Sequence, residues 1–382
     1  MLFFGLLFNL LMCCFWKKMK IAIAVIDATA DFFVATKRII FVSIFYFFVS
    51  VACFLIWMGC FACVISLSDI SADQSSYVGK NIVPTTQVKV LSSFMFFGLI
   101  WGLLFIKDKT VFICMCSAAS YYFSSSPLKG GSGSVMRSFK FTYFKHAGSI
   151  ALGSLLHAIF TIIRMMMESL ADSGRRSDNA AAKIIALIAL CLARCMEDMI
   201  EYLTKLSYAF MSVSGQSYCT SAWNGFLINL KHCVKFYFAN QLAAMFVFIG
   251  SMMIISLNCG ALYLTMNYII KDASRVDSLL GPMISVAFIT MITCVIFLGL
   301  FDEAVLATIH CMAIDMDLNE GKPEFGPPSF HAKINDIFND DMDKVVDTEK
   351  NPNDGVMPTQ QYTPVNGYPN HGTVQTGTNN MF

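Results

Sequence analysis

The chain has 382 residues, of which 56% are hydrophobic and only 14% are charged. Soluble globular chains contain about 45–50% apolar residues even when glycine is counted, so this composition excludes a soluble fold. The formal net charge of +1 at pH 7 is too balanced to indicate a nucleic-acid partner. The lipid bilayer is therefore the expected environment.

The longest uncharged segments predict membrane-spanning helices. They run from Ile39 to Ser68, from Phe236 to Ile270 and from Ser278 to Phe301. Each reaches the roughly 20 residues that a helix needs to cross a hydrocarbon core about 30 Å thick. The sequence thus predicts an all-α polytopic membrane protein.

The N-terminal part contains a short apolar segment, an amphipathic helix and the clearest span. Met1 to Phe15 is short for a span, and its lysines follow the apolar run, so we expect no cleavable signal peptide. Lys17 to Arg38 mixes apolar and charged positions, which is typical of a helix along the cytoplasmic interface. Ile39 to Ser68 is the clearest span, and the polar segment from Asp69 to Lys89 is expected to be an aqueous loop.

The segment from Val90 to Phe123 is apolar except for Lys107, Asp108 and Lys109. A charge at the centre of a bilayer costs about 2.5–3.5 kcal/mol on insertion scales, so the triplet is not expected in mid-lipid. Two arrangements meet this condition. Either two short helices form a hairpin at the triplet, or one long helix places it near an interface or in a polar cavity. Hydropathy alone leaves both open.

The second half of the chain contains four further expected spans. They are Ala147 to Met167, Ile184 to Val213, Asn240 to Ile270 and Leu280 to Met312. The Ser/Gly/Lys-rich segment 124–146 and the polar segment 168–183 are expected to be loops. With one long helix across 90–123 the count is seven spans, and the distribution of Lys and Arg leaves the orientation open.

Charged side chains recur at steps of three and four within Ile184 to Val213, which makes it the least lipid-like of the expected helices. They are Arg194, Glu197, Asp198, Glu201 and Lys205. Side chains at this spacing share one helix face and can pair.

The chain becomes polar from Asp315 onward, and an acidic patch there is followed by a Pro/Asn/Gly/Thr-rich end. Such a composition cannot bury enough apolar surface to fold alone. We therefore expect a transmembrane domain over residues 1–325 and a flexible tail over residues 326–382. The fourteen cysteines lie at or before Cys311, within or beside apolar segments, which is typical of small core residues. No disulfide framework, metal site or cofactor is expected.

Several short motifs occur in a specific order. They are KMKIAIAVIDA at Lys18–Ala28, GLIW at Gly98–Trp101, AASYYF at Ala118–Phe123, the span His146–Ile163, the run from Cys195-Met196-Glu197 through Tyr208 to Tyr218–Ala222, and Ala313-Ile314-Asp315 with Asn319–Gly321. Together these motifs resemble the choline transporter-like family over residues 10–325.

The resemblance implies a larger family architecture, with a large extracellular domain after the first span. This chain resembles the last seven spans of that architecture, from the fourth helix onward. One long helix across 90–123 and a cytoplasmic tail are also implied. Two positions depart from the family pattern. Leu206, in the run Leu206-Ser207-Tyr208, stands where the family has Asn, and Leu306 stands where it has a second acidic residue after the one matching Asp302.

Aromatic residues in the family-like motifs are the candidate substrate contacts. A quaternary ammonium is recognised by π faces, and a desolvated cation–π contact contributes about 2 kcal/mol or more. The candidates are Trp101, Tyr121, Tyr122 and Tyr208. The alternative is that they are ordinary interfacial aromatics.

Acidic residues within the spans are the candidates for ion coupling, because ionisable groups inside a membrane are usually functional. They are Glu197, Glu201, Asp302 and Glu303. Alternatively, Glu197 and Glu201 pair with Arg194 and Lys205, and Asp302 and Glu303 mark the cytoplasmic end of the last span.

Small residues and one histidine are expected to serve packing. Gly98 with Gly102, and Ser149 with Gly153, allow close helix approach, and we expect this packing inside one protomer rather than at a dimer interface. His157 is interpreted as a hydrogen-bonded packing residue rather than a proton relay.

Two functions remain open at this point, and no motif of an enzyme occurs, so we expect the chain not to be one. The first hypothesis is a membrane transporter of choline or a related organic cation by alternating access. The alternative is a divergent, transport-inactive membrane subunit with a structural role in a larger complex, bound to other membrane subunits. Either protein would be an integral multi-pass protein of the plasma membrane or an organelle membrane.

Overall fold

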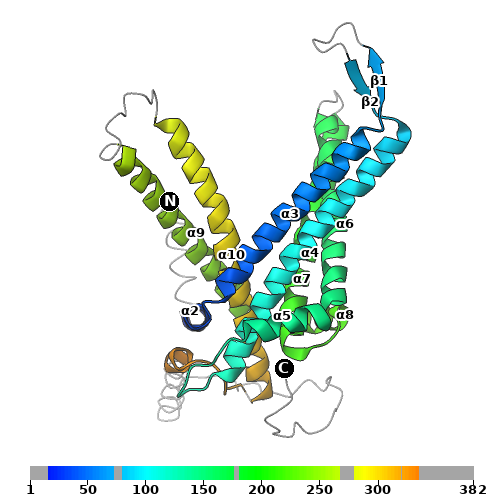
Figure 1. The fold of residues 1–382 in the computed structure, drawn as a ribbon. Helices are drawn as coiled ribbons and strands as arrows, with labels where there is room; N and C mark the ends of the chain where they lie inside the picture. The colour runs from blue at the N-terminus through cyan, green and yellow to red at the C-terminus, as the bar shows by residue number, and fades with distance from the viewer. Residues whose placement is uncertain (1–15, 73–79, 176–179, 267–278, 320, 335–382) are drawn as a thin grey trace.

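The computed structural model describes residues 16–72, 80–175, 180–266, 279–319 and 321–334 (Figure 1). The predicted helical membrane architecture is confirmed. The helices are α2 (Trp16–Ala35), α3 (Ile39–Ile65), α4 (Thr86–Ser124), α5 (Val135–Phe144), α6 (Ala147–Arg175), α7 (Ala180–Ser214), α8 (Tyr218–Lys231), α9 (Cys233–Leu264) and α10 (Leu280–Leu318). Two short strands, β1 (Asp69–Ala72) and β2 (Lys80–Val83), complete the described elements.

Five described helices are long and apolar enough to cross a membrane: α3, α4, α6, α9 and α10. The predicted span Ile184 to Val213 lies in α7, which is not among these five because charged residues interrupt its apolar sequence. The predicted first segment, Met1 to Phe15, lies outside the described residues. The count of seven spans therefore stays a prediction.

The charged triplet lies within one continuous helix, α4, as the second of the two sequence-based arrangements predicts. Asp108 is 5% exposed and faces the other helices. The Lys109 ammonium lies 4.0 Å from the Phe105 ring centroid and 4.4 Å from that of Tyr143, while Lys107 pairs with Glu201. One continuous helix accommodates the triplet because Asp108 faces protein, Lys109 lies over aromatic rings and the half-exposed Lys107 pairs with Glu201.

Three segments expected to be loops contain regular structure. Within Asp69 to Lys89, β1 and β2 pair antiparallel, with Asp69 opposite Val83, and α4 begins before the segment ends. Segment 124–146 contains α5, whose Phe139 and Phe141 pack against the core. Segment 168–183 is mostly helical, because Glu168 pairs with Arg164 on its own helix and with Arg194 on α7.

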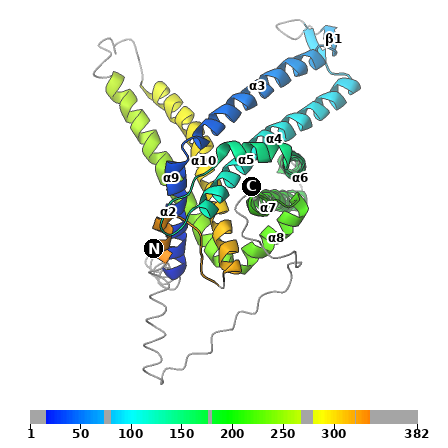
Figure 2. The same ribbon diagram turned by 60° about the horizontal axis from the view of Figure 1, so that its bottom comes forward.

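The long helices converge at one end of the molecule and diverge at the other. The α3–α4 pair and the α9–α10 pair lie close together at the lower end of Figure 1 and separate towards the β-hairpin. Figure 2 shows α10 in the middle, with α2 on one side and α7 and α8 on the other, and α10 contacts all of these helices. Apolar side chains on the diverging halves, such as Phe94, Phe248 and Phe288, are exposed and suit a lipid environment.

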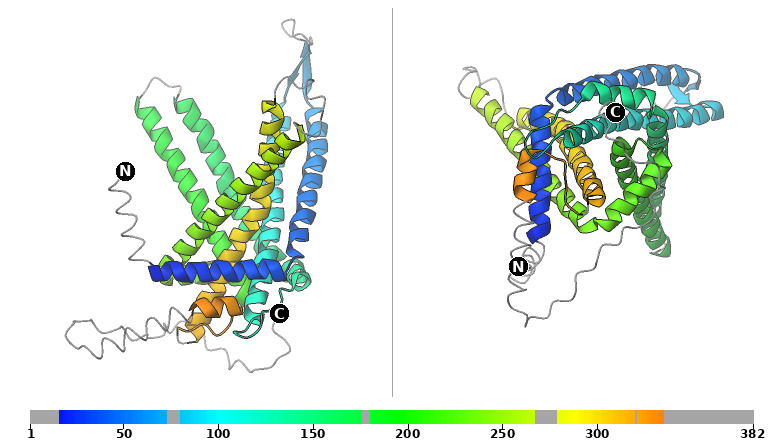
Figure 3. Two further views of the ribbon diagram at one scale, coloured as in Figure 1. Left: turned by 90° about the vertical axis from the view of Figure 1, so that its left-hand side faces the viewer. Right: turned by 90° about the horizontal axis from the view of Figure 1, so that it is seen from below.

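The hydrophobic core lies where the helices converge. It combines the C-terminal halves of α4 and α10 with α2 and the C-terminal part of α7. Helix α2 runs roughly perpendicular to the long helices (Figure 3), which is the orientation expected of a helix along a membrane surface. Its Val25 and Phe32 are buried in the same core.

The segment that follows α10, residues 321–334, folds back onto the bundle. Phe330 and Ile334 are buried in the core, and the Lys333 ammonium lies 2.7 Å from the Asp27 carboxylate on α2. Asp315, near the end of α10, accepts hydrogen bonds from the Tyr122 hydroxyl at 3.0 Å and from the Phe325 backbone N–H at 3.0 Å. Packed structure therefore continues past the predicted domain boundary at residue 325, and the flexibility of residues 335–382 stays a prediction.

Replacing Phe330 with Ala should destabilise the bundle, because Phe330 is 0% exposed and contacts the Tyr122 ring with a centroid separation of 5.9 Å. Phe-to-Ala changes in cores cost about 3–5 kcal/mol. The measurement is the melting midpoint of the detergent-solubilised protein. Phe325→Ala is the matched control, because Phe325 is 36% exposed, and deletion of residues 335–382 should leave the midpoint nearly unchanged. Equal losses for Phe330→Ala and Phe325→Ala would contradict the packing described.

Candidate functional site

A cavity of about 490 Å³ lies between α3, α4, α7 and α10. Its wall combines two aromatic rings with four charged side chains. They are Tyr46, Phe47, Lys107, Lys205, Asp302 and Glu303. The volume is in the range of small-molecule sites, and convergent charged groups of this kind are the usual marker of one.

Ion pairs join three of the helices around this cavity. The Lys205 ammonium on α7 lies 2.8 Å from Glu303 Oε1 on α10 and 3.5 Å from Glu201 Oε1 on its own helix. The Lys107 ammonium on α4 lies 3.4 Å from the same oxygen of Glu201. Glu201 and Lys205 are four residues apart, so both point to the same side of α7. The resulting series, Lys107–Glu201–Lys205–Glu303, is called the charge chain below.

Carboxylates outnumber lysines at and beside the cavity, because Asp302 adds to a charge chain that is itself neutral. Lys107 and Lys205 face three carboxylates, those of Glu201, Asp302 and Glu303. Among the described residues, Asp302 has no ion pair, and Glu303 Oε2 has no hydrogen-bond partner although the Glu303 side chain is only 9% exposed. The site is therefore suited to a cation.

Two aromatic rings of α3 complete the wall. Tyr46 is buried, and its hydroxyl lies 2.8 Å from the Tyr143 hydroxyl on α5, which fixes the ring orientation. Phe47 follows it at the cavity wall. Aromatic faces beside carboxylates are the groups that bind an organic cation, since the π faces attract the charge without needing a hydrogen-bond donor.

The structure brings together three of the four predicted acidic residues. Asp302 and Glu303 line the cavity and Glu201 is connected to Glu303 through Lys205, whereas Glu197 pairs with Arg164 on α6. The predicted Glu201–Lys205 pair is present, but Arg194 pairs with Glu168 rather than with Glu197. His157 Nε2 lies 3.9 Å from Glu201 Oε2, on the side of the charge chain that faces α6.

The four predicted aromatic contacts lie outside the cavity wall. The Tyr208 hydroxyl lies 2.9 Å from Asp108 Oδ2 and 3.2 Å from the Ile150 carbonyl oxygen, so it links α7 to α4 and α6. Trp101 Nε1 donates to the Ala151 carbonyl oxygen at 3.3 Å. Tyr121 and Tyr122 lie further along α4, about 20 Å from Asp108 at 1.5 Å per residue. The sequence-based set is thus distributed along the core rather than gathered at one site.

Sequence reasoning missed Tyr46 and Phe47 because α3 is rich in aromatic residues throughout. One signal distinguishes them. Ser43 and Ser50 are polar positions in an otherwise apolar helix, and both line the cavity with Tyr46 and Phe47. Their spacing places them on one helix face, so a serine stripe indicates which aromatic residues face protein.

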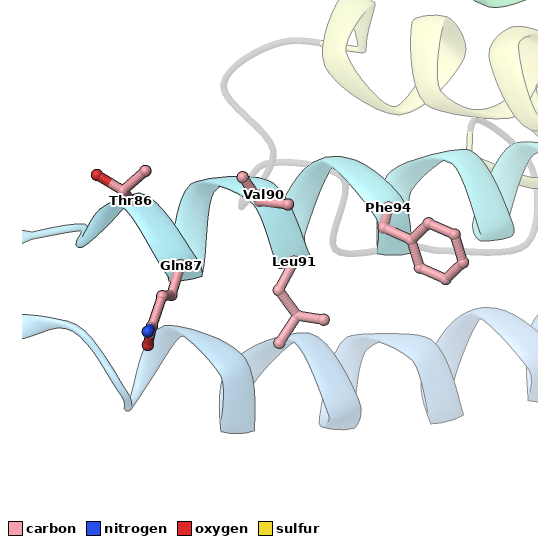
Figure 4. A pocket seen from close by; sticks show the side chains of 5 residues that line it. All are labelled: Thr86, Gln87, Val90, Leu91 and Phe94. Carbon is pink, nitrogen blue, oxygen red and sulfur yellow. The ribbon is translucent and has the colours of Figure 1, made fainter.

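A second hollow, of about 480 Å³, lies near the N-terminal end of α4. Figure 4 shows its residues on this one helix, with Gln87 and Leu91 pointing towards the neighbouring helix. No ionisable side chain lines this hollow, and a single element forms its wall. It therefore offers no chemistry comparable with that of the cavity.

The profile of the plasma-membrane choline transporter family matches residues 1–317. The chain belongs to this family. The resemblance inferred from the motifs is confirmed, and with it the assignment as an integral multi-pass membrane protein of a transporter family.

Relatives within the choline transporter family are distant. Choline transporter-like protein 2 of Dictyostelium discoideum is 24% identical over 320 residues, which cover 83% of this chain and 50% of the relative. Human choline transporter-like protein 3 is 22% identical over 310 residues, covering 81% and 46%. Choline transporter-like protein 1 of Caenorhabditis briggsae is 29% identical over 182 residues, covering 46% and 23%. The chain spans about half the length of the first two.

Gly153→Ala should displace Tyr208 from Asp108. A Cβ at Gly153 on α6 would overlap the Tyr208 hydroxyl and lie 2.8 Å from Tyr218 Cε2. Overpacking of this kind costs about 1–3 kcal/mol, so the melting midpoint in detergent should fall. Gly148→Ala on the same helix is the matched control, because no atom lies within 4 Å of its new Cβ. A midpoint that falls no further with Gly153→Ala than with Gly148→Ala would contradict the close approach.

Proposed function

We propose that this chain binds choline or a related organic cation in the cavity between α3, α4, α7 and α10 and moves it across the membrane by alternating access. The observation that carries the proposal is the composition of the cavity wall. Tyr46 and Phe47 provide aromatic faces, and Asp302 and Glu303 provide carboxylates, which together with Glu201 outnumber Lys107 and Lys205 by one. Membership of the choline transporter family supports the same substrate class.

The chemistry of a quaternary ammonium explains why both kinds of group are needed. Its nitrogen carries four carbon substituents and no hydrogen, so it donates no hydrogen bond. Carboxylates attract it through charge, and that attraction is stronger in a partly buried site than in water. Aromatic faces then replace the water that the cation loses on entry. Asp302, which has no ion pair among the described residues, is the carboxylate most accessible to such a ligand.

The position of the cavity suits alternating access. It lies between the α3–α4 pair and α10, and these elements converge at one end and separate at the other (Figure 1). Small rigid-body changes between such helix groups expose a fixed site to one side or the other. At the converging end, the Tyr122–Asp315 hydrogen bond joins α4 to α10 and would be one of the contacts that changes.

A transport-inactive structural subunit is the second candidate. Leu306, on α10, is buried where the family resemblance implies a second acidic residue, and Leu206 on α7 is buried where it implies Asn. In such a subunit the charge chain would serve only to hold the helices together. Failure to bind choline would favour this candidate.

Tyr46→Leu should weaken choline binding about tenfold or more, because it removes a π face worth roughly 2 kcal/mol when desolvated. Binding of labelled choline to the purified protein is the measurement. Tyr46→Phe keeps the ring and loses the hydroxyl bonded to Tyr143, so it should bind nearly as the wild type does. Phe48→Leu, at a position 64% exposed on the same helix, is the second control. Equal affinities in all four proteins would exclude Tyr46 from the site.

Gly299→Cys should test alternating access directly. Gly299 lines the cavity, and no atom lies within 4 Å of a new Cβ there, so the side chain is accommodated. In proteoliposomes, a membrane-impermeant trimethylammonium thiol reagent should modify position 299 when added to either side, and choline should slow both reactions. Peptide mass spectrometry separates this position from the native cysteines. Modification from one side only, with or without choline, would contradict alternating access.

A further inference from the structure

The geometry points to Lys205 as a tethered cation that competes with the transported cation for the Glu303 carboxylate, and moves towards Glu201 when that cation binds. This inference rests on the proposed function and assigns a specificity-determining role at the same site. Lys205 does not bind the transported cation itself. It determines how readily the Glu303 carboxylate is available to that cation.

The Glu303 carboxylate is buried and only partly satisfied by its neighbours. Its side chain is 9% exposed, Oε1 lies 2.8 Å from the Lys205 ammonium, and Oε2 has no hydrogen-bond partner. A buried carboxylate is costly unless a cation and hydrogen bonds satisfy it. Lys205 therefore supplies the charge but leaves one carboxylate oxygen without a hydrogen-bond partner.

An organic cation at this carboxylate would lie close to the Lys205 ammonium. Two positive charges at such short range repel each other, and the repulsion is strong where little water screens it. The two cations therefore exclude each other from Glu303. The aromatic wall formed by Tyr46 and Phe47 favours the quaternary ammonium, whereas Lys205 is held near Glu303 by its own side chain.

Lys205 can leave Glu303 and still remain paired with a carboxylate. Glu201 Oε1 lies 3.5 Å from the same ammonium, one helical turn earlier on α7. A small rotation of the flexible lysine side chain thus exchanges one carboxylate for the other. Glu201 also lies near Lys107 and His157, and the positive charge of Lys107 keeps Glu201 from holding Lys205 exclusively.

The chain offers a matched control for the effect of charge alone. Lys107 lines the same cavity and carries the same charge as Lys205, but it pairs with Glu201 at 3.4 Å and not with Glu303. Lys107→Met and Lys205→Met therefore remove the same charge from the same cavity. Only the second vacates the Glu303 carboxylate.

The experiment measures choline affinity of the purified 382-residue chain in detergent by equilibrium binding of labelled choline. If Lys205 occupies Glu303 for about nine-tenths of the time, its removal should tighten binding about tenfold. Lys107→Met should tighten binding clearly less. The double variant Lys205→Met with Glu303→Gln should lose the gain. Equal effects of the two lysine variants, or weaker binding by Lys205→Met, would overturn the inference.

Glu201→Gln provides an independent test if Lys205→Met does not fold. It removes the charge that receives Lys205, so choline affinity should fall, although Glu201 is not itself in the cavity wall. Unchanged or tighter binding would overturn the inference. If the wild type binds choline but the variants do not change affinity as expected, the inference fails and the proposed function stands. No choline binding by any form would overturn the proposed function and the inference with it.

Discussion

The ion pair between Lys205 and Glu303 is the interaction around which the charged groups of the cavity are arranged. It joins α7 to α10 at 2.8 Å, and the charge chain extends it through Glu201 to Lys107 on α4. Removing one partner of a buried pair costs about 3–5 kcal/mol, and the partial exposure of Lys205 reduces that figure. The charge chain thus connects α4, α7 and α10 around the cavity, and apolar packing of the same three helices in the core also holds them together.

The sequence was sufficient for the long apolar helices but not for the shorter helices α5 and α8 or for the helix ends. Hydropathy predicts α3, α9 and α10, and the family motifs favour the continuous α4. Some polar segments that were expected to be loops are helical. In them, polar side chains pair with side chains of a neighbouring helix, as Glu168 does with Arg194. The composition of a segment indicates whether the segment as a whole suits water or lipid. It does not report a specific partner on a helix that is distant in the chain.

The candidate site was predictable in part for the same reason. Acidic residues inside spans are rare and expensive, so Glu201, Asp302 and Glu303 could be selected from sequence alone. Aromatic residues are common in spans, so their type does not indicate which ones face a cavity. Tyr208 and Tyr46 illustrate the difference, since both are buried tyrosines whose hydroxyls have partners, yet only Tyr46 lines the cavity. Only the packing of α3 against α4 and α10 distinguishes them.

Under the proposed function, the same constraint would govern stability and transport. A carboxylate as buried as Glu303 requires a cation at all times, whether that cation belongs to the protein or to the solute. Binding of a solute would therefore not have to compensate the cost of dehydrating Glu303, because folding has already buried that carboxylate. The solute would only have to replace the electrostatic attraction between Lys205 and Glu303, while Glu201 would keep the displaced lysine paired. Such an exchange between nearly equal partners allows the solute to leave again, which tight and unopposed binding to a buried carboxylate would prevent.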